Sequence, residues 1–193
     1  MQIFHPLQRA LSRFGRGEAG GLSIESILTL PTLAWALLAC FSYFDGLRQY
    51  NINIKAAHTM GDLLSRETQV VDDDYIDGMH DVLKFLTRSA AEPRMRISVV
   101  AYDGDDDSFE LIWSEARGGQ AALTEAGLKS IEGRLPMAFG GSQLIVVETS
   151  IDHKAPFVFG LSDRTLDNFL VTRLRFVPQL NHEDHMEDNT GTS

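Results

Sequence analysis

The sequence predicts an α+β protein in which a long N-terminal transmembrane helix extends into a small domain, with an antiparallel sheet of about four strands and one or two short helices. Three observations support this class. Residues 22–44 carry one charged side chain, Glu25, within an otherwise apolar run. Apolar residues then recur at steps of three and four as far as Leu64, which is typical of an amphipathic helix. From Met95 onward the period changes to two, as in β-strands.

The composition limits the kinds of protein that this chain can be. Its 193 residues are enough for one ordinary core beside a membrane segment. The formal net charge is −10, and the excess of acidic residues follows residue 45. Such an acidic domain repels phosphate backbones, so nucleic acid is not expected as a partner. Cys40 is the single cysteine, which excludes an intramolecular disulfide and a thiolate metal cluster.

The apolar run is long enough to span a bilayer. As a helix, residues 22–44 would measure about 35 Å, against about 30 Å for the hydrocarbon core. A removable secretory signal has a shorter apolar stretch of about 7–15 residues, so a retained transmembrane helix over 21–44 is predicted, with the lipid bilayer as a partner. Residues 1–20 form a basic, glycine-rich leader that is expected to be mostly unstructured and cytoplasmic. Residues 45–180 would then form a periplasmic domain that includes the outer half of the helix.

The domain after the span is predicted from capping residues and changes of period. Aspartates at 72–74 are candidate N-caps for a second helix that reaches about Ser89. Acidic residues 103–107 separate two alternating segments and predict a polar hairpin turn. Further along the chain we expect a helix at 121–132 and strands at 144–151 and 171–177. Residues 181–193 are acidic and poor in apolar side chains, which predicts a disordered tail.

Glu25 requires a partner if it lies inside the span. A carboxylate at the centre of a membrane helix costs about 2.5–3.5 kcal/mol on insertion scales, and less near the interface. Cleavage between Gly20 and Gly21 would create an α-amino group, and an axially staggered neighbouring helix could bring that cation to Glu25. An alternative is that Glu25 is an interfacial residue of an ordinary signal anchor, with its carboxylate among headgroups or water. Pro31 is not specific by itself, because many membrane helices contain a proline.

Residues 20–31, with the sequence GGLSIESILTLP, resemble the start of the TadE/TadG-like pseudopilins of the tight-adherence (Tad/Flp, type IVc) pilus assembly system. In that family a glycine, a few small residues, a glutamate and an aliphatic run lead to a proline six residues after the glutamate. Glu25 and Pro31 have this interval. The resemblance implies a pilin-like fold, cleavage after Gly20 by a prepilin peptidase, and roles in assembly for Glu25 and Pro31.

The same resemblance implies a function in assembly of a type IV pilus-like machine. Such proteins are minor pseudopilins or accessory assembly components, so the expected partners are other Tad pseudopilins, the prepilin peptidase and the inner-membrane pilus platform. The expected location is the bacterial inner membrane, with the C-terminal domain in the periplasm or in an extracellular pilus. The closing segment 173–178 resembles the basic-aromatic-proline strand at the end of these proteins. Ser26 departs from the family, which usually has phenylalanine or tyrosine there.

No motif in the sequence predicts an enzyme. The chain contains no HExxH pair, nucleophile elbow or phosphate loop, so neither catalysis nor a cofactor is expected. Asp103, Asp105 and Asp107 are weak calcium candidates, but their loop lacks the glycine and glutamate of an EF-hand, and a solvated turn is favoured. His182 and His185 have the spacing of a metal pair, yet a flexible tail would provide no preformed site.

Two other functions remain open from the sequence. One is an uncleaved single-pass membrane protein that carries a periplasmic binding or scaffold domain. The other is a membrane-tethered, metal-dependent enzyme that uses the acidic turn. Acylation of Cys40, as in a lipoprotein, is disfavoured because Glu25 would lie within the apolar core of the signal.

Overall fold

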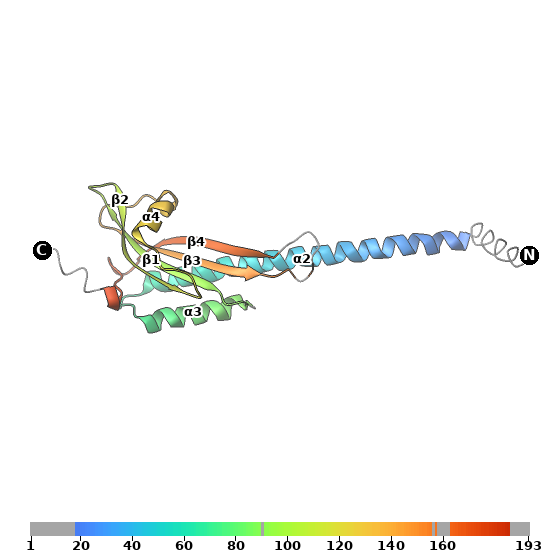
Figure 1. Cartoon of the computed structure of the whole chain (residues 1–193), viewed down its shortest axis with the longest axis horizontal. Helices are drawn as coiled ribbons and strands as arrows, with labels where there is room; N and C mark the ends of the chain where they lie inside the picture. The colour runs from blue at the N-terminus through green and yellow to red at the C-terminus, as the bar shows by residue number, and fades with distance from the viewer. Residues whose placement is uncertain (1–17, 90, 156, 158–162, 186–193) are drawn as a thin grey trace, which may run out of the picture. The chain divides into compact units, whose positions relative to one another are not determined.

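The computed structural model describes residues 18–89, 91–155, 157 and 163–185 (Figure 1). The expected leader, except for its last three residues, lies outside these ranges, as does the end of the expected tail. The chain divides into two compact units, which are taken in turn below.

The first unit, residues 1–45 with 155–162, contains the start of the longest helix. Helix α2, Glu18–Arg66, is 49 residues long and continuous. The expectation of an unstructured leader as far as residue 20 is wrong for its last residues, because α2 begins at Glu18 and passes through both Gly20 and Gly21. A glycine in a helix costs about 1 kcal/mol relative to alanine, which is too little to end a helix that continues for many turns.

Most apolar side chains of α2 between Glu25 and Phe44 are exposed. They include Ile27, Leu28, Leu30, Leu33, Trp35, Leu37, Phe41 and Phe44. A helix that faces lipid presents such a surface, whereas a helix in a soluble core buries it. Within the described ranges, α2 is the one helix that is long and apolar enough to cross a membrane. The expectation of a single membrane-spanning segment near the N-terminus agrees with this helix.

The second unit, residues 46–154 with 163–193, is built on a four-stranded antiparallel sheet. Its strands are β1 Arg94–Asp103, β2 Ser108–Arg117, β3 Gln143–His153 and β4 Arg164–Arg173. They lie in the order β2-β1-β3-β4, and every neighbouring pair is antiparallel (Figure 1). The predicted fold class is confirmed: a long apolar helix leads into a small domain with four antiparallel strands and two short helices. The predicted hairpin corresponds to β1 and β2.

The last strand lies earlier in the chain than the sequence pattern indicates. We expected a strand at 171–177, but β4 begins at Arg164 and ends at Arg173. Arg173 pairs with Leu144, which is the second residue of β3, so a longer β4 would have no partner strand. The start of β4 is rich in polar residues, and this composition hides the alternation by which a half-buried strand is recognised.

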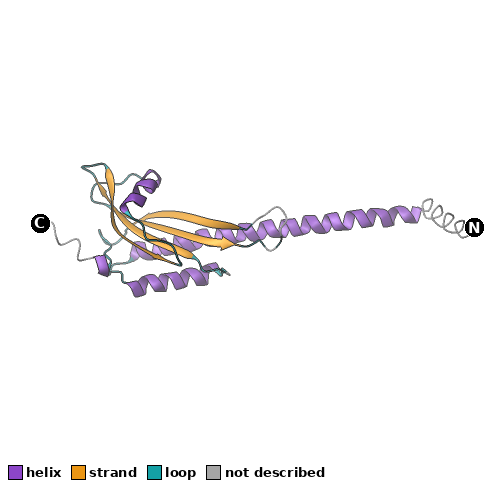
Figure 2. Ribbon diagram, in the orientation of Figure 1, coloured by secondary structure: helices purple, strands orange, loops and turns teal. Residues whose placement is uncertain are grey.

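Helix α3 and the outer part of α2 cover one face of the sheet (Figure 2). Helix α3, Asp73–Thr87, begins where the Asp72 carboxylate accepts the backbone N–H of Tyr75, and it ends before Arg88 in the left-handed conformation. The core on this face is formed by Ala56, Met60 and Leu64 of α2, Ile76, Met79 and Leu83 of α3, and Met95, Ile97, Val99, Trp113, Ile145 and Val147 of the sheet. The later part of the apolar stripe predicted after the span, from Ala57 to Leu64, is therefore buried, whereas Leu47 and Tyr50 at its start are exposed.

A smaller helix covers part of the other face. Helix α4, Glu125–Ile131, is followed by the 3-10 turn η1, Glu132–Arg134. It begins later than the predicted helix at 121–132, because the Thr124 hydroxyl accepts the backbone N–H of Gly127 and acts as its N-cap. The second core beneath it contains Val100, Leu123, Leu128, Ile131, Leu144 and Val146. Within the described residues, no other helix lies over this face of the sheet.

The segment after β4 packs back onto the domain. Leu180 is buried, and its carbonyl oxygen accepts a hydrogen bond of 2.8 Å from Trp113 Nε1. The backbone N–H of Leu180 donates to the Gln143 side-chain oxygen at 2.9 Å. These contacts fix the chain immediately before the expected tail.

The expectation of a disordered tail from residue 181 is wrong for its first five residues. Val71 and His182 form a parallel bridge, in which Val71 N–H donates to Asn181 O and Glu183 N–H donates to Val71 O, each at 2.9 Å. A 3-10 turn, η2, Glu183–His185, follows. The acidic composition did not reveal that this backbone finds partners across the loop before α3.

Candidate functional site

The first candidate site is the N-terminal part of α2, which carries the residues that the resemblance relates to processing and assembly. Gly20 and Gly21 lie near the start of the helix, and Glu25 follows Gly21 by four residues. Residues four apart share one face of a helix, so Gly21 and Glu25 lie on the same face. Glu25 is exposed, and among the described residues it has no ion-pair partner.

Pro31 lies within the helix, about 9 Å along the axis from Glu25. Because proline has no N–H, one helical hydrogen bond is missing at this position. The neighbouring threonines use their own hydroxyl groups locally: Thr29 donates to the Glu25 carbonyl oxygen at 2.7 Å, and Thr32 donates to the Leu28 carbonyl oxygen at 2.9 Å. These polar groups are therefore satisfied within the helix, as an apolar surrounding requires. The Glu25 carboxylate has no such partner among the described residues.

The acidic turn between β1 and β2 is a solvent-facing hairpin turn. Asp103 accepts the backbone N–H of Asp105 at 2.8 Å, and the Tyr102 hydroxyl donates to the Asp107 carboxylate. The hydrogen bond to Asp107, followed by burial, raises the pKa of Tyr102 above its usual value. Asp105 and Asp107 are exposed. In this fully described turn, Asp103, Asp105 and Asp107 do not converge as a group of three ligands.

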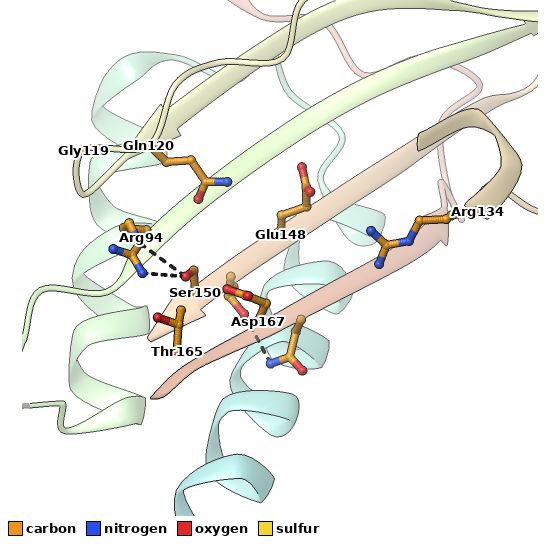
Figure 3. A pocket seen from close by; sticks show the side chains of 10 residues that line it. Arg94, Gly119, Gln120, Arg134, Glu148, Ser150, Thr165 and Asp167 are labelled. Carbon is orange, nitrogen blue, oxygen red and sulfur yellow. Dashed lines mark hydrogen bonds between the residues drawn. The ribbon is translucent and has the colours of Figure 1, made fainter. Parts of the chain in front are cut away.

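A polar depression lies on the sheet face beside α4 (Figure 3). Arg94 donates to the Ser150 hydroxyl at 2.9 Å and to the Asp152 carboxylate at the same distance. Arg134 lies with its guanidinium 3.8 Å from the centre of the Phe169 ring. Arginine and carboxylate side chains thus alternate over the part of the sheet that α4 leaves open. The sequence analysis did not identify this surface.

In the described residues that line the depression, the hydrogen bonds of the Ser150 hydroxyl come from Arg94. The Ser150 hydroxyl contacts the Arg94 guanidinium, which cannot accept a proton from it. Glu148 is held by Arg96 in an ion pair of 2.5 Å. This surface can bind polar groups through its arginines and carboxylates.

A third group of side chains meets at the other edge of the sheet, beside η2. Glu115 of β2, His182 and His185 each offer one ligand atom, and these three atoms lie within 4.8 Å of one another. The spacing of the two histidines is visible in the sequence, but Glu115 is not, since 70 residues separate Glu115 from His185. Sequence spacing alone gives no signal for a contact of this range.

Comparison with models of protein families, with curated proteins and with solved structures finds no match.

Proposed function

We propose that this chain is a minor pseudopilin or accessory assembly component of a Tad-type pilus machinery. The proposal is based on the environment of Glu25. Its carboxylate is exposed on an apolar helix, and it has no ion-pair partner among the described residues. An ionised group on such a surface is costly in lipid unless a cation lies beside it. A partner on another molecule would satisfy this requirement and would make the charge a docking element.

The cation that we propose is the α-amino group of a neighbouring processed subunit. A prepilin peptidase would cut between Gly20 and Gly21 on the cytoplasmic face and remove the basic leader. The new terminus at Gly21 would carry a positive charge, and an axially staggered neighbour would place its terminus against Glu25. The exposed apolar side chains around Glu25 would pack against the neighbouring helix, so that the ion pair fixes the register between subunits.

The location and the partners that we propose come from the resemblance at 20–31. The protein would reside in the bacterial inner membrane with its N-terminus in the cytoplasm and its sheet domain in the periplasm. Its partners would be other Tad pseudopilins, the prepilin peptidase and the inner-membrane platform. The domain would serve as a folded body attached to the assembling helix, without a catalytic function.

The first test is the mass of the mature chain purified from its native membrane. We expect a polypeptide that begins at Gly21. An intact leader that begins at Met1 would contradict processing and would favour the uncleaved membrane-anchored scaffold instead.

The second test is substitution of the carboxylate. Glu25→Gln removes the charge but keeps the shape, so we expect normal cleavage and a strong loss of pili and of co-purified pseudopilins. Glu110→Gln, at an exposed position of β2, is the matched control and should assemble normally. Normal piliation in Glu25→Gln would refute the docking role.

A further inference from the structure

The group formed by Glu115, His182 and His185 has the composition of a metal site. One ligand atom from each lies within 4.8 Å of the others, and His185 Nε2 lies 3.4 Å from Glu115 Oε1. In a tetrahedral zinc site with bonds of about 2.0–2.1 Å, neighbouring ligand atoms are about 3.3 Å apart. One edge of the triangle therefore already has this length, and the longest needs to close by about 1.5 Å.

The backbone that carries the two histidines is held in place. Residues on both sides of His182 are hydrogen-bonded to Val71, and the carbonyl oxygen of Leu180 accepts from the Trp113 side chain. The His182 ring packs against the indole of Trp113 with a distance of 5.3 Å between ring centres. The segment is thus part of the folded domain, and the objection that a flexible tail cannot provide a preformed site does not apply to it.

His182 has an unsatisfied polar atom. The residue is 1% exposed, and its Nε2 atom has no hydrogen-bond partner within the described part of the chain. Its Nδ1 atom accepts a long hydrogen bond of 3.3 Å from the backbone N–H of Asp184, which places the proton of the neutral ring on Nε2. Coordination through Nε2 therefore moves this proton to Nδ1 and gives up the long bond to Asp184. A buried ring nitrogen without a partner is destabilising, and coordination of a cation is one way to remove that cost.

The charges around the group favour a cation. Asp72, Asp73, Asp74, Glu183 and Asp184 line one hollow beside the same turn. Arg117 is the positive group that faces Glu115: its Nη1 atom lies 3.0 Å from Glu115 Oε2, and the same guanidinium binds two carboxylates of α3. Arg117 therefore fixes one oxygen of Glu115 and leaves Oε1 on the side of His185.

We propose that Glu115, His182 and His185 bind one divalent transition-metal ion, with zinc as the expected occupant. Two imidazoles and one carboxylate are suitable ligands for zinc, and three protein ligands leave a fourth position for water. The hard ions calcium and magnesium prefer sets made of oxygen atoms alone. This inference is independent of the proposed role in pilus assembly, because it uses none of the residues of the N-terminal helix.

The test is a calorimetric titration of the full chain in detergent micelles with zinc chloride. The protein is purified without a histidine tag, because a tag would bind the metal itself. We expect one zinc ion per chain, and an affinity at least about tenfold lower in both His185→Ala and Glu115→Gln. His58→Ala removes another exposed histidine, at a position on α2, and should leave the affinity unchanged.

Cobalt provides a second readout that reports geometry. Cobalt bound at this site should give the visible absorption of a tetrahedral ion in the wild type and in His58→Ala, and lose it in His185→Ala. Circular dichroism of each variant, compared with the wild type, establishes that the domain is folded. Absence of saturable zinc binding by the folded wild type, or equal binding by His185→Ala, would overturn the proposal.

Discussion

Asn53 of α2 donates its side-chain N–H to the Leu166 carbonyl oxygen of β4 at 2.7 Å. The Asn53 side chain is fully buried on the face of α2 that packs against the sheet. Its side-chain oxygen accepts the Thr149 hydroxyl of β3 at 3.1 Å. One amide therefore joins the helix to two neighbouring strands. Because both bonds are buried, their loss leaves polar groups that water cannot reach.

Asn53→Ala is expected to lower the free energy of unfolding by about 1–3 kcal/mol, since it removes the donor to the Leu166 carbonyl and the acceptor of the Thr149 hydroxyl proton. The measurement is urea unfolding of the full chain in detergent, followed by the fluorescence of buried Trp113. A Trp35→Phe background removes the second of the two tryptophans. Asn51→Ala, an exposed position on the same helix, is the control and should change the unfolding free energy by less than about 0.5 kcal/mol. Equal effects of the two substitutions would show that the buried amide contributes nothing.

A second prediction concerns the close approach of α2 to β4 at Gly61. A Cβ atom at this position would lie 2.7 Å from Leu170 Cδ2, whereas a Cβ at Gly78 of α3 would meet no atom within 4 Å. Alanine is favoured over glycine in a helix by about 1 kcal/mol, so Gly78→Ala should raise the unfolding free energy by about that amount. Gly61→Ala gains the same propensity but displaces Leu170, and it should remain at least about 1 kcal/mol less stable than Gly78→Ala.

Urea unfolding of the two alanine variants and of Gly61→Val provides the comparison. The larger valine should destabilise the domain by about 1–3 kcal/mol because it overfills the contact between the helix and the strand. If Gly61→Val is as stable as the wild type, α2 does not pack this closely against β4.

The elements that the sequence predicts well are those with a strong local signal. Helix α3 has both a helical period and an N-cap at Asp72, and the β1–β2 hairpin has alternating segments on either side of an acidic turn. The extent of β4 depends instead on its pairing with β3, and pairing is not visible in the composition of one segment. The order of residues 181–185 likewise depends on Val71, which lies more than one hundred residues earlier in the chain.

The candidate sites likewise differ in whether a local sequence pattern indicates them. Glu25 and Pro31 are proposed from a short motif, because the resemblance depends on an interval along one helix. Glu115 joins the histidines only after the sheet has formed and the C-terminal segment has packed against β2. The polar depression that includes Arg94 and Arg134 arises from five separate parts of the chain, and no local pattern indicates it.

A third prediction concerns alkaline pH and Tyr75. Burial, followed by the negative charge of Glu67 and a hydrogen bond to it, raises the pKa of Tyr75 from 10.0 to about 12. The folded chain thus holds the phenol proton more tightly than the unfolded chain does. The resulting stabilisation is complete below about pH 10 and is lost as the pH rises towards 12.

The measurement is the urea midpoint at pH 9 and at pH 11 for the wild type and for Tyr75→Phe. We expect a smaller decrease in Tyr75→Phe, because the phenol that loses its proton is absent. Tyr50→Phe removes a tyrosine on the exposed side of α2 and controls for general alkaline effects. An identical decrease in the wild type and in Tyr75→Phe would contradict the assigned shift.

The last prediction compares two apolar residues of the C-terminal segment. Leu180 is 1% exposed and packs in the main core beside Trp113, whereas Phe176 is 68% exposed. Leu180→Ala leaves a cavity and should lower the unfolding free energy by about 2–5 kcal/mol. Phe176→Ala deletes more atoms but loses little burial, so it should change the same quantity by less than about 0.5 kcal/mol. Urea unfolding decides the point: if Leu180→Ala costs no more than Phe176→Ala, the C-terminal segment does not form part of the folded core.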